Sequence, residues 1–468
     1  MNPNNLESLT IHAIGGGWGQ EAPDEESTQR VAVIRGTDIP KIISGDFSSV
    51  PFRYESPRKV ASRLLKAGDL VIEVSGGSSA NGQHTGRPLH ITRKIIENLG
   101  GSVIPASFCR LLRLDSSKVD PSFIYYQISC MHLNKEISEF ENQSTGISNF
   151  QFPRFLSEIQ PKLKSLDKQR EIANFLKSID QCISLTYSTN RTLAAIAQTL
   201  FKSWFVDFDP VRRKTAGHLP EWLDEDTANL FPEEFEDSEH GIIPKGWERV
   251  PFGRFLSHII GGDWGTETPD EKNDQQVAII RGTDIPDLRY STNNRVPTRY
   301  TSSKKLKSRR LQDGDIILEV SGGSKEQPTG RSIYITETLL KRFDSPVEPA
   351  SFCKLLRPES IEISLLLGLH LEFIYSRGKT WEYQNQSTGI SNFQTTHFLE
   401  TELVVVPPDD VLAKFYEKVR PMIDCSHITS AQRLIEMRDN LLPKLISGEI
   451  GLPQATSISM KGELMGEG

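Results

Sequence analysis

The feature that most constrains this chain is an internal duplication. The heptapeptide IRGTDIP occupies residues 34–40 and again residues 280–286, and the segments EVSGGS, TGR, ASFC and QSTGISNFQ each recur in the same order. The offset between matched segments drifts only from 246 to 243 residues. A constant order at a nearly constant offset indicates two copies of one domain. A chain of 468 residues is therefore predicted to hold two equivalent domains, each followed by a further segment.

Each copy is predicted to be a mixed α+β domain. The segments LVIEV (70–74) and IILEV (316–320) are rich in β-branched residues and are bounded by glycine, which is typical of strands. Patterns typical of helices, such as residues 121–139, surround them. The first domain is assigned to residues 1–160 and the second to residues 246–407.

Two long helices are predicted to follow the two domains. Apolar residues recur at steps of three and four through residues 166–205 and again through 409–447, the spacing of an amphipathic helix. We assign these helices to 161–206 and 408–450, and Pro421 and Pro443 are possible breaks or kinks in the second. Because each helix alone would expose an apolar stripe, we expect an antiparallel coiled coil with pseudo-twofold symmetry, with the domains at its opposite ends. An ordinary core helix is the alternative.

The formal charge of −7 is concentrated in one segment. Residues 221–239 contain nine acidic and no basic residues, and they lie in what we interpret as a solvated acidic linker, 207–245. Basic clusters occur at equivalent places in the two copies, at 53–66 and 291–310. Such a pair suits an anionic polymer that is contacted twice, although a solvated basic face is the alternative. A flexible tail is expected at 451–468.

The sequence also predicts the cellular compartment and indicates neither disulfide bonds nor a zinc site. Five cysteines without CxxC or Cys/His spacing give no disulfide framework and no zinc site, and Cys109 and Cys353 are expected to be buried thiols. The N-terminal residues have no signal-peptide pattern, and no apolar run is long enough to span a bilayer. We therefore expect a cytoplasmic protein.

Known catalytic motifs for chemistry on DNA are not matched. The GKT at residues 378–380 lacks the leading glycine of a phosphate-binding loop, and no methyltransferase motif is found. Asp69 with Glu73, and Asp315 with Glu319, resemble the paired carboxylates of a metal-dependent nuclease. However, Ser75 and Ser321 stand where such a site usually has a basic residue. We predict no catalytic residue and no bound metal.

Polar residues of the repeated motifs are predicted instead to contact a polynucleotide. Arginine can bind phosphate or guanine, Ser-Gly-Gly turns expose backbone amides, and QSTGISNF offers uncharged donors and acceptors. For each residue, a structural role in a turn or toward a carbonyl group is the alternative. The candidates are Arg35, Thr37, Ser75, Arg87, Ser144, Thr145 and Asn149 in the first copy, and Arg281, Thr283, Lys304, Lys305, Ser321, Arg331, Ser387, Thr388 and Asn392 in the second.

Several segments resemble the specificity subunit of type I restriction-modification systems. The resemblance rests on the duplicated domain with QSTGISNF near its end, LFKSWFVDFDPVRRKTAG at 200–217, FPEEFEDSEHGIIPKGWERV at 231–250 and RDNLLPKLISGEI at 438–450. It covers nearly the whole chain. It implies two target recognition domains that bind the two halves of an interrupted DNA site, joined by helices that set the spacer.

The resemblance also implies partners and a cofactor that this chain does not bind. Methyltransferase subunits would supply the S-adenosylmethionine chemistry, and a translocating restriction subunit would complete the nuclease. Because the two domains are unusually alike, we expect a near-palindromic interrupted site, with half-sites on the order of 35 to 45 Å apart. Two alternatives are a self-contained DNA-modifying enzyme or nuclease with an unrecognised site, and a two-domain scaffold for another ligand such as a polysaccharide.

Overall fold

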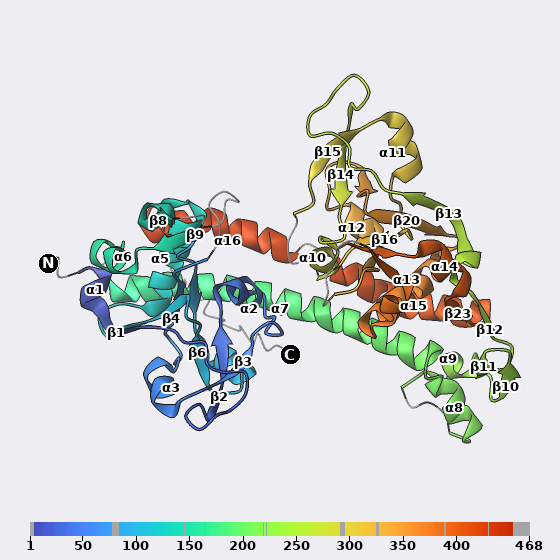
Figure 1. Ribbon diagram of the computed structural model, residues 1–468, viewed down its shortest axis with the longest axis horizontal. Helices are drawn as coiled ribbons and strands as arrows, with labels where there is room; N and C mark the ends of the chain where they lie inside the picture. The colour runs from blue at the N-terminus through green and yellow to red at the C-terminus, as the bar shows by residue number, and fades with distance from the viewer. Residues whose placement is uncertain are drawn as a thin grey trace, which may run out of the picture. The chain divides into compact units, whose positions relative to one another are not determined.

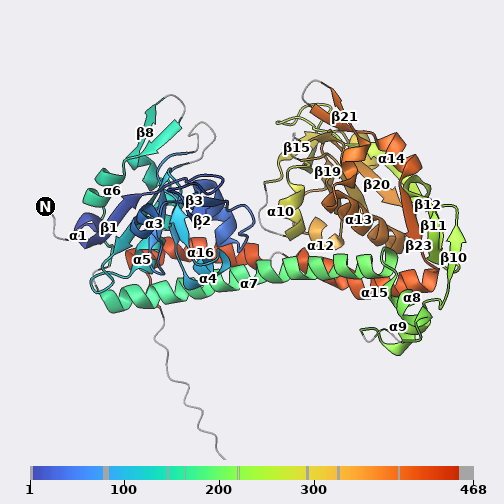
Figure 2. The same ribbon diagram turned by 60° about the horizontal axis from the view of Figure 1, so that its bottom comes forward.

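The computed structural model describes residues 4–76, 84–144, 147–163, 165–218, 220, 222–290, 295–323, 327–387, 390–428 and 430–452, without the side chains of residues 143, 144, 147, 386, 387 and 390. The chain divides into two compact units (Figures 1 and 2). Unit 1 comprises Met1–Ser184 and Arg433–Gly468, and unit 2 comprises Leu185–Gln432. None of the described helices is both long and apolar enough to cross a bilayer.

Unit 1 is built on a sheet that is covered on both faces. The predicted strand β4 (Leu70–Glu73) lies inside the sheet and is buried along its whole length. Leu70 and Ile72 belong to one apolar cluster, whereas Val71 between them belongs to another, as expected when alternate side chains point to opposite faces. The four-stranded sheet has the order β1 (Thr10–Gly15), β7 (Cys109–Leu114), β4, β5 (Pro88–His90), with antiparallel neighbours throughout.

Smaller elements complete unit 1. A three-stranded sheet has the order β3 (Phe52–Glu55), β2 (Gln29–Ile34), β6 (Val103–Pro105). The hairpin of β8 (Glu141–Ser144) and β9 (Ile147–Phe150) lies on the side of the unit away from the long helix α7 (Figure 2). The helices are α1 (Leu6–Leu9), α2 (Ile39–Ile43), α3 (Pro57–Arg63), α4 (Arg93–Asn98), α5 (Pro121–Leu133) and α6 (Phe152–Glu158).

The second domain, within unit 2, repeats the three sheets of unit 1 and adds one short strand beside its hairpin. Its four-stranded sheet has the order β13 (Leu256–Gly261), β20 (Cys353–Pro358), β16 (Ile316–Glu319), β18 (Ser332–Tyr334). The pairing register also matches, since Glu73 faces Cys109 and Glu319 faces Cys353. Its other strands are β15 (Thr298–Thr301), β14 (Gln275–Ile280) and β19 (Val347–Pro349), then β17 (Ser321–Gly322), β22 (Ile390–Phe393) and β21 (Gln384–Ser387).

The helices of unit 2 follow the same plan. They include α10 (Ile285–Tyr290), α11 (Ser303–Arg309), α12 (Glu337–Leu340), α13 (Ile361–Ser376) and α14 (Thr395–Thr401). The duplication predicted from the sequence is thus confirmed as two homologous α+β domains. Cys109 and Cys353 are both fully buried, as predicted.

The first long helix, α7 (Leu166–Phe205), is continuous over 40 residues, as its apolar spacing predicted. In unit 1, Leu176 of α7 and Leu442 of α16 (Ser430–Ser447) share one buried cluster. Asp180 accepts a hydrogen bond from Arg438 at 2.8 Å, and Leu163 lies beside Gly448, so the two helices run antiparallel there. In unit 2, the ring of Phe205 packs at 4.7 Å, centre to centre, against that of Phe415 in α15 (Asp409–Ser426).

The second long helix is broken, because α15 ends at Ser426 and α16 begins at Ser430. Pro421 and Pro443 both lie inside helices, so neither proline causes the break. Instead α15 ends beside His427, which is buried and hydrogen-bonded through Nδ1 to Oγ1 of Thr336 at 2.8 Å. A tertiary contact with the second domain therefore ends α15.

Residues 207–245, which we interpreted as an acidic linker, form short helices and strands within unit 2. They contain α8 (Asp209–Thr215), α9 (Glu225–Asn229), β10 (Phe235–Ser238) and β11 (Gly241–Pro244). Phe231 packs edge-on against Trp204 at 4.9 Å between ring centres, and Asp224 pairs with Lys418 at 2.8 Å. The next strand, β12 (Glu248–Pro251), pairs with β23 (Leu403–Val406).

Candidate nucleic-acid interface

In unit 1 the repeated motifs meet where four loops join. The amide of Ala106 donates to the carbonyl of Ile34 at 2.8 Å, and the amides of Val74 and Ser75 both donate to the carbonyl of Phe108, at 2.8 and 3.4 Å. The amide of Phe150 donates to the carbonyl of Val74 at 2.9 Å. These bonds bring RGTD, EVSGG, ASFC and SNF together. We call residues 35–38, 73–76, 105–109 and 148–150 the loop junction of unit 1.

Unit 2 builds the same junction from residues 281–284, 319–323, 349–353 and 391–393. The amide of Ala350 donates to Ile280, those of Val320 and Ser321 donate to Phe352, and that of Phe393 donates to Val320, at 2.8, 2.8, 3.3 and 2.9 Å. The predicted residues Ser321 and Asn392 face each other across β17 and β22. Ser75 and Asn149 form the equivalent isolated bridge in unit 1.

Two of the predicted arginines are bound within the protein. Nε and Nη2 of Arg35 donate to the Asp38 carboxylate at 2.9 and 2.8 Å, and Nη2 also donates to the carbonyl of Ser49. Arg281 makes the equivalent pair with Asp284 at 2.9 and 2.7 Å. The structural role left open for these arginines is therefore present in both units. Roughly a third of each side chain still faces solvent, 38% for Arg35 and 37% for Arg281.

Arg87 and Arg331 face the two buried glutamates of EVSGGS. Arg331 donates to the Glu319 carboxylate at 2.8 and 2.5 Å, whereas the closest approach of Arg87 to Glu73 is 4.0 Å. Burial raises the pKa of Glu73, and Arg87 only partly opposes this effect. The glutamate and arginine thus form an internal pair at the base of each junction.

The carboxylates that resembled a nuclease site are all paired with arginine. Asp69 accepts two hydrogen bonds from Arg113, both at 2.6 Å, and Asp315 accepts two from Arg357 at 2.7 and 2.8 Å. A bidentate arginine occupies the oxygens that a metal ion would need. Within the part of the chain that the structure describes, no group of three or more His, Cys, Asp or Glu residues is placed to hold a metal ion.

The remaining candidates differ in exposure. Thr37, Asn149, Thr283, Lys304 and Asn392 are exposed, and Ser75 and Ser321 are half-buried. Ser144 and Ser387 lie in the strands of the two hairpins, but their side chains are outside the described part. Thr145 and Thr388 lie outside the described residues altogether. Uncharged donors and acceptors therefore surround each junction on the solvent side.

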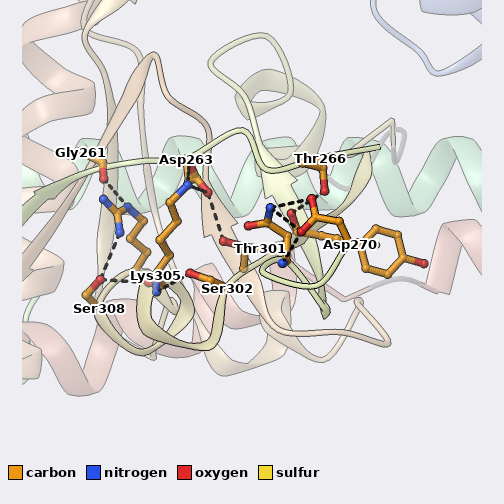
Figure 3. A network of polar contacts seen from close by, with 11 residues as sticks. Gly261, Asp263, Thr266, Asp270, Thr301, Ser302, Lys305 and Ser308 are labelled. Carbon is orange, nitrogen blue, oxygen red and sulfur yellow. Dashed lines mark hydrogen bonds and ion pairs between the residues drawn. The ribbon is translucent and has the colours of Figure 1, made fainter. Parts of the chain in front are cut away.

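The basic cluster of unit 2 is partly neutralised by a local network (Figure 3). Nζ of Lys305 donates to both oxygens of Asp263 at 3.0 Å, and Oγ1 of Thr301 donates to the same carboxylate at 3.1 Å. Although burial opposes them, these bonds lower the pKa of Asp263. Arg309 donates to the carbonyl of Gly261 at 2.9 Å. The predicted contact residue Lys305 is thus tied to its own domain.

Unit 1 achieves the same pairing with a carboxylate from a strand, whereas Asp263 of unit 2 lies in the loop after β13. Lys59 pairs with Glu55 of β3 at 3.1 Å, and Glu55 occupies the position equivalent to Thr301. In exchange, Gly17 stands where unit 2 has Asp263. The lysine thus has a carboxylate partner in both units, although the carboxylate comes from a strand in unit 1 and from a loop in unit 2.

A repeated aromatic and arginine pair was missed from the sequence. The guanidinium carbon of Arg53 lies 4.9 Å from the centre of the Trp18 ring, and Arg299 lies 4.9 Å from that of Trp264. Each tryptophan is about two-fifths exposed. The signal was present as GGGWG at 15–19 and GGDWG at 261–265, because a large aromatic side chain recurs there between glycines.

Comparisons with known proteins show which proteins this chain is similar to. No protein-family model matches the chain. It is 24% identical over 439 residues to the HindI type I restriction enzyme specificity subunit of Haemophilus influenzae, covering 83% of this chain and 88% of that protein. It is also 24% identical over 465 residues to the MjaIX type I specificity subunit of Methanocaldococcus jannaschii, covering 96% and 94%. The chain is thus similar, over most of its length, to type I restriction enzyme specificity subunits.

Solved structures of specificity subunits also resemble this one. The S subunit of a type I restriction-modification system from M. genitalium is 14% identical with a TM-score of 0.45, covering 95% of this chain and 97% of that one. The subunit from Thermoanaerobacter tengcongensis is 13% identical with a TM-score of 0.30, covering 95% and 96%. The arginine-bound carboxylates of this chain fit a structural role.

Proposed function

We propose that this chain is a specificity subunit and selects the DNA sequence on which a type I restriction-modification complex acts. The observation that carries the proposal is the loop junction, which occurs twice with the same backbone bonds and the same exposed polar residues. Thr37 with Asn149, and Thr283 with Asn392, offer the hydrogen-bonding groups that read base edges in a groove. Each unit would bind one half of an interrupted duplex site.

The likeness of the two junctions supports a near-palindromic target. Ser75 and Asn149 in unit 1 correspond to Ser321 and Asn392 in unit 2, in the same pairing. Equal side chains on equal backbones favour equal base sequences. If the long helices relate the two domains by a pseudo-twofold axis, these sequences are inverted repeats on the duplex.

The complex would supply the chemistry. We propose that methyltransferase subunits bind S-adenosylmethionine, that a restriction subunit joins them, and that the long helices of this chain contribute to their docking. This chain itself is proposed to bind no cofactor and to act in the cytoplasm, where host DNA is accessible. A self-contained nuclease receives no support from Asp69 and Asp315, since both are bound to arginine.

A binding experiment tests this function. The full chain is purified with its methyltransferase subunits, and its affinity for duplex DNA is measured by mobility shift over a range of salt concentrations. We expect affinity to fall linearly with salt on logarithmic axes, because phosphate contacts release counterions. DNA affinity that does not change with salt, or DNA that is displaced by an uncharged polysaccharide, would support the alternative of a scaffold for another ligand.

A further inference from the structure

Each loop junction presents one phenylalanine to solvent. Phe108 is 65% exposed and Phe352 is 66% exposed, which makes them the most exposed phenylalanine or tryptophan side chains among the described residues. They occupy the same place in the ASFC repeat. A single exposed apolar residue needs no explanation. Because the same aromatic side chain is exposed at the same place in both copies, we infer that it contacts another molecule.

The backbone beneath each phenylalanine is fixed by neighbouring loops. The Phe108 carbonyl accepts the amides of Val74 and Ser75, and the next residue, Cys109, is fully buried. Gly16 lies so close on the other side that a β-carbon there would be 2.1 Å from the Ala106 carbonyl oxygen. Gly262 and Ala350 repeat this contact at 2.2 Å. A ring on a fixed turn loses little entropy when it binds a ligand.

The surroundings of the ring favour nucleic acid over an apolar protein surface. Within unit 1 the carbonyl of Phe108 is bonded to Ser75, whose strand partner is the exposed Asn149. Arg87 lies behind them against Glu73. One apolar ring beside exposed hydrogen-bonding side chains matches a surface that contacts bases, where phenylalanine can touch a thymine methyl group or a base face.

We propose that Phe108 makes an apolar contact with a base in one half-site of the DNA target, and that Phe352 makes the equivalent contact in the other half-site. This inference rests on the proposed function and adds to it a specificity-determining residue in each unit. The two residues act in parallel, so each is expected to matter for its own half-site.

The test uses the complex of the full chain with its methyltransferase subunits and a duplex carrying the mapped target. Phe108→Ala and Phe352→Ala are each expected to weaken specific binding by about tenfold, or ~1.4 kcal/mol, and the double variant by more, since each ring is expected to make its own apolar contact with a base. Affinity for a duplex without the target should change by less than about twofold, because phosphate contacts are retained. Ile11→Ala is the matched control, because Ile11 is 63% exposed in unit 1 and Ser257 replaces it in the second copy.

Substituted bases distinguish the two apolar contacts. Uracil is placed at each thymine of the target in turn. If uracil weakens binding by the native complex but not by the Phe108→Ala complex, the ring contacts a thymine methyl group. If uracil weakens binding by both complexes equally, and Phe108→Ala itself binds the target more weakly, the ring contacts a base face. Both results support the proposal.

Two other results would overturn the proposal. The first is a Phe108→Ala complex that binds the target as tightly as the Ile11→Ala complex does. The second is a Phe108→Ala chain that loses its methyltransferase subunits but regains full DNA affinity when an excess of those subunits is added. That result would show that the ring contacts a partner subunit and not DNA. A native complex without preference for the mapped target would instead contradict the proposed function itself.

Discussion

Gly36 lies against the carboxylate of Glu73, so closely that a β-carbon at this position would be 2.2 Å from Oε1. Gly282 stands in the same relation to Glu319, also at 2.2 Å. The glycine of RGTD and the glutamate of EVSGG are thus one packing unit, although 37 residues of sequence separate them in each copy. The contact explains why both residue types recur in the duplication.

Gly36→Ala is therefore expected to destabilise unit 1. The added methyl group must displace a buried carboxylate, and overpacking of this kind costs about 1–3 kcal/mol. Urea denaturation measures the change in the free energy of unfolding. Gly15→Ala is the control, since a β-carbon there meets no atom within 4 Å. Equal stabilities for the two variants would contradict the packing argument.

Glu348→Ile is expected to stabilise unit 2 at alkaline pH. Glu348 is fully buried, neither carboxylate oxygen has a hydrogen-bond partner in the structure, and burial with the nearby Asp263 raises its pKa to about 7. Because the folded pKa exceeds the unfolded one, stability is full below pH ~4.5 and falls as the pH rises through 7.

Isoleucine suits this position because Ile104 occupies it in unit 1. Ile104 pairs with Val33 in the register in which Glu348 pairs with Ile279. At pH 8 the gain should be about 1–3 kcal/mol, the usual cost of a buried polar group without a partner. Thermal unfolding at pH 5 and pH 8 gives the comparison, and a gain that is as large at pH 5 would count against ionisation as its cause.

His427 should make the chain sensitive to acid. Complete burial, together with Arg342, Arg289 and Arg420, lowers its pKa to about 3. The unfolded histidine binds a proton near pH 6.5, whereas the folded one does not, so stability is full above pH 6.5 and falls as the pH drops toward 3. Between pH 7 and pH 5 the loss should be about 1–2 kcal/mol.

His427→Gln removes this titrating group. The variant is expected to be less stable at pH 7, because the bond with Thr336 is disturbed, but to lose less stability on acidification. Unfolding curves at several pH values measure the slope. If the variant and the native chain have the same slope, another group causes the acid sensitivity.

The elements with a regular local signal could be predicted from the sequence. The apolar spacing of α7 runs through 40 residues without proline or glycine, so its existence was predictable, although the helix begins at Leu166 and not at the assigned residue 161. The repeats identified the two domains for a similar reason, since they required no knowledge of tertiary contacts. The break after Ser426 was different, because it depends on the contact between His427 and the distant Thr336.

The roles of side chains at the loop junctions were harder to predict from the sequence. Arg35 and Arg281 were interpreted as DNA contacts, yet each forms an ion pair with the aspartate three residues later. Phe108 lies in a largely apolar run that suggests burial, and only the turn between β6 and β7 shows that its ring faces solvent. Exposure and pairing depend on the neighbouring loops, which local sequence does not specify.

Methylated-base sequencing of a host that carries this chain with its methyltransferase subunits tests the central claim most directly. We predict one interrupted motif whose two halves are similar inverted sequences, with methylation that disappears when this chain is deleted. Two unrelated half-sites would contradict the equivalence of the two loop junctions. Methylation that persists unchanged without the chain would contradict its role in selecting the sequence.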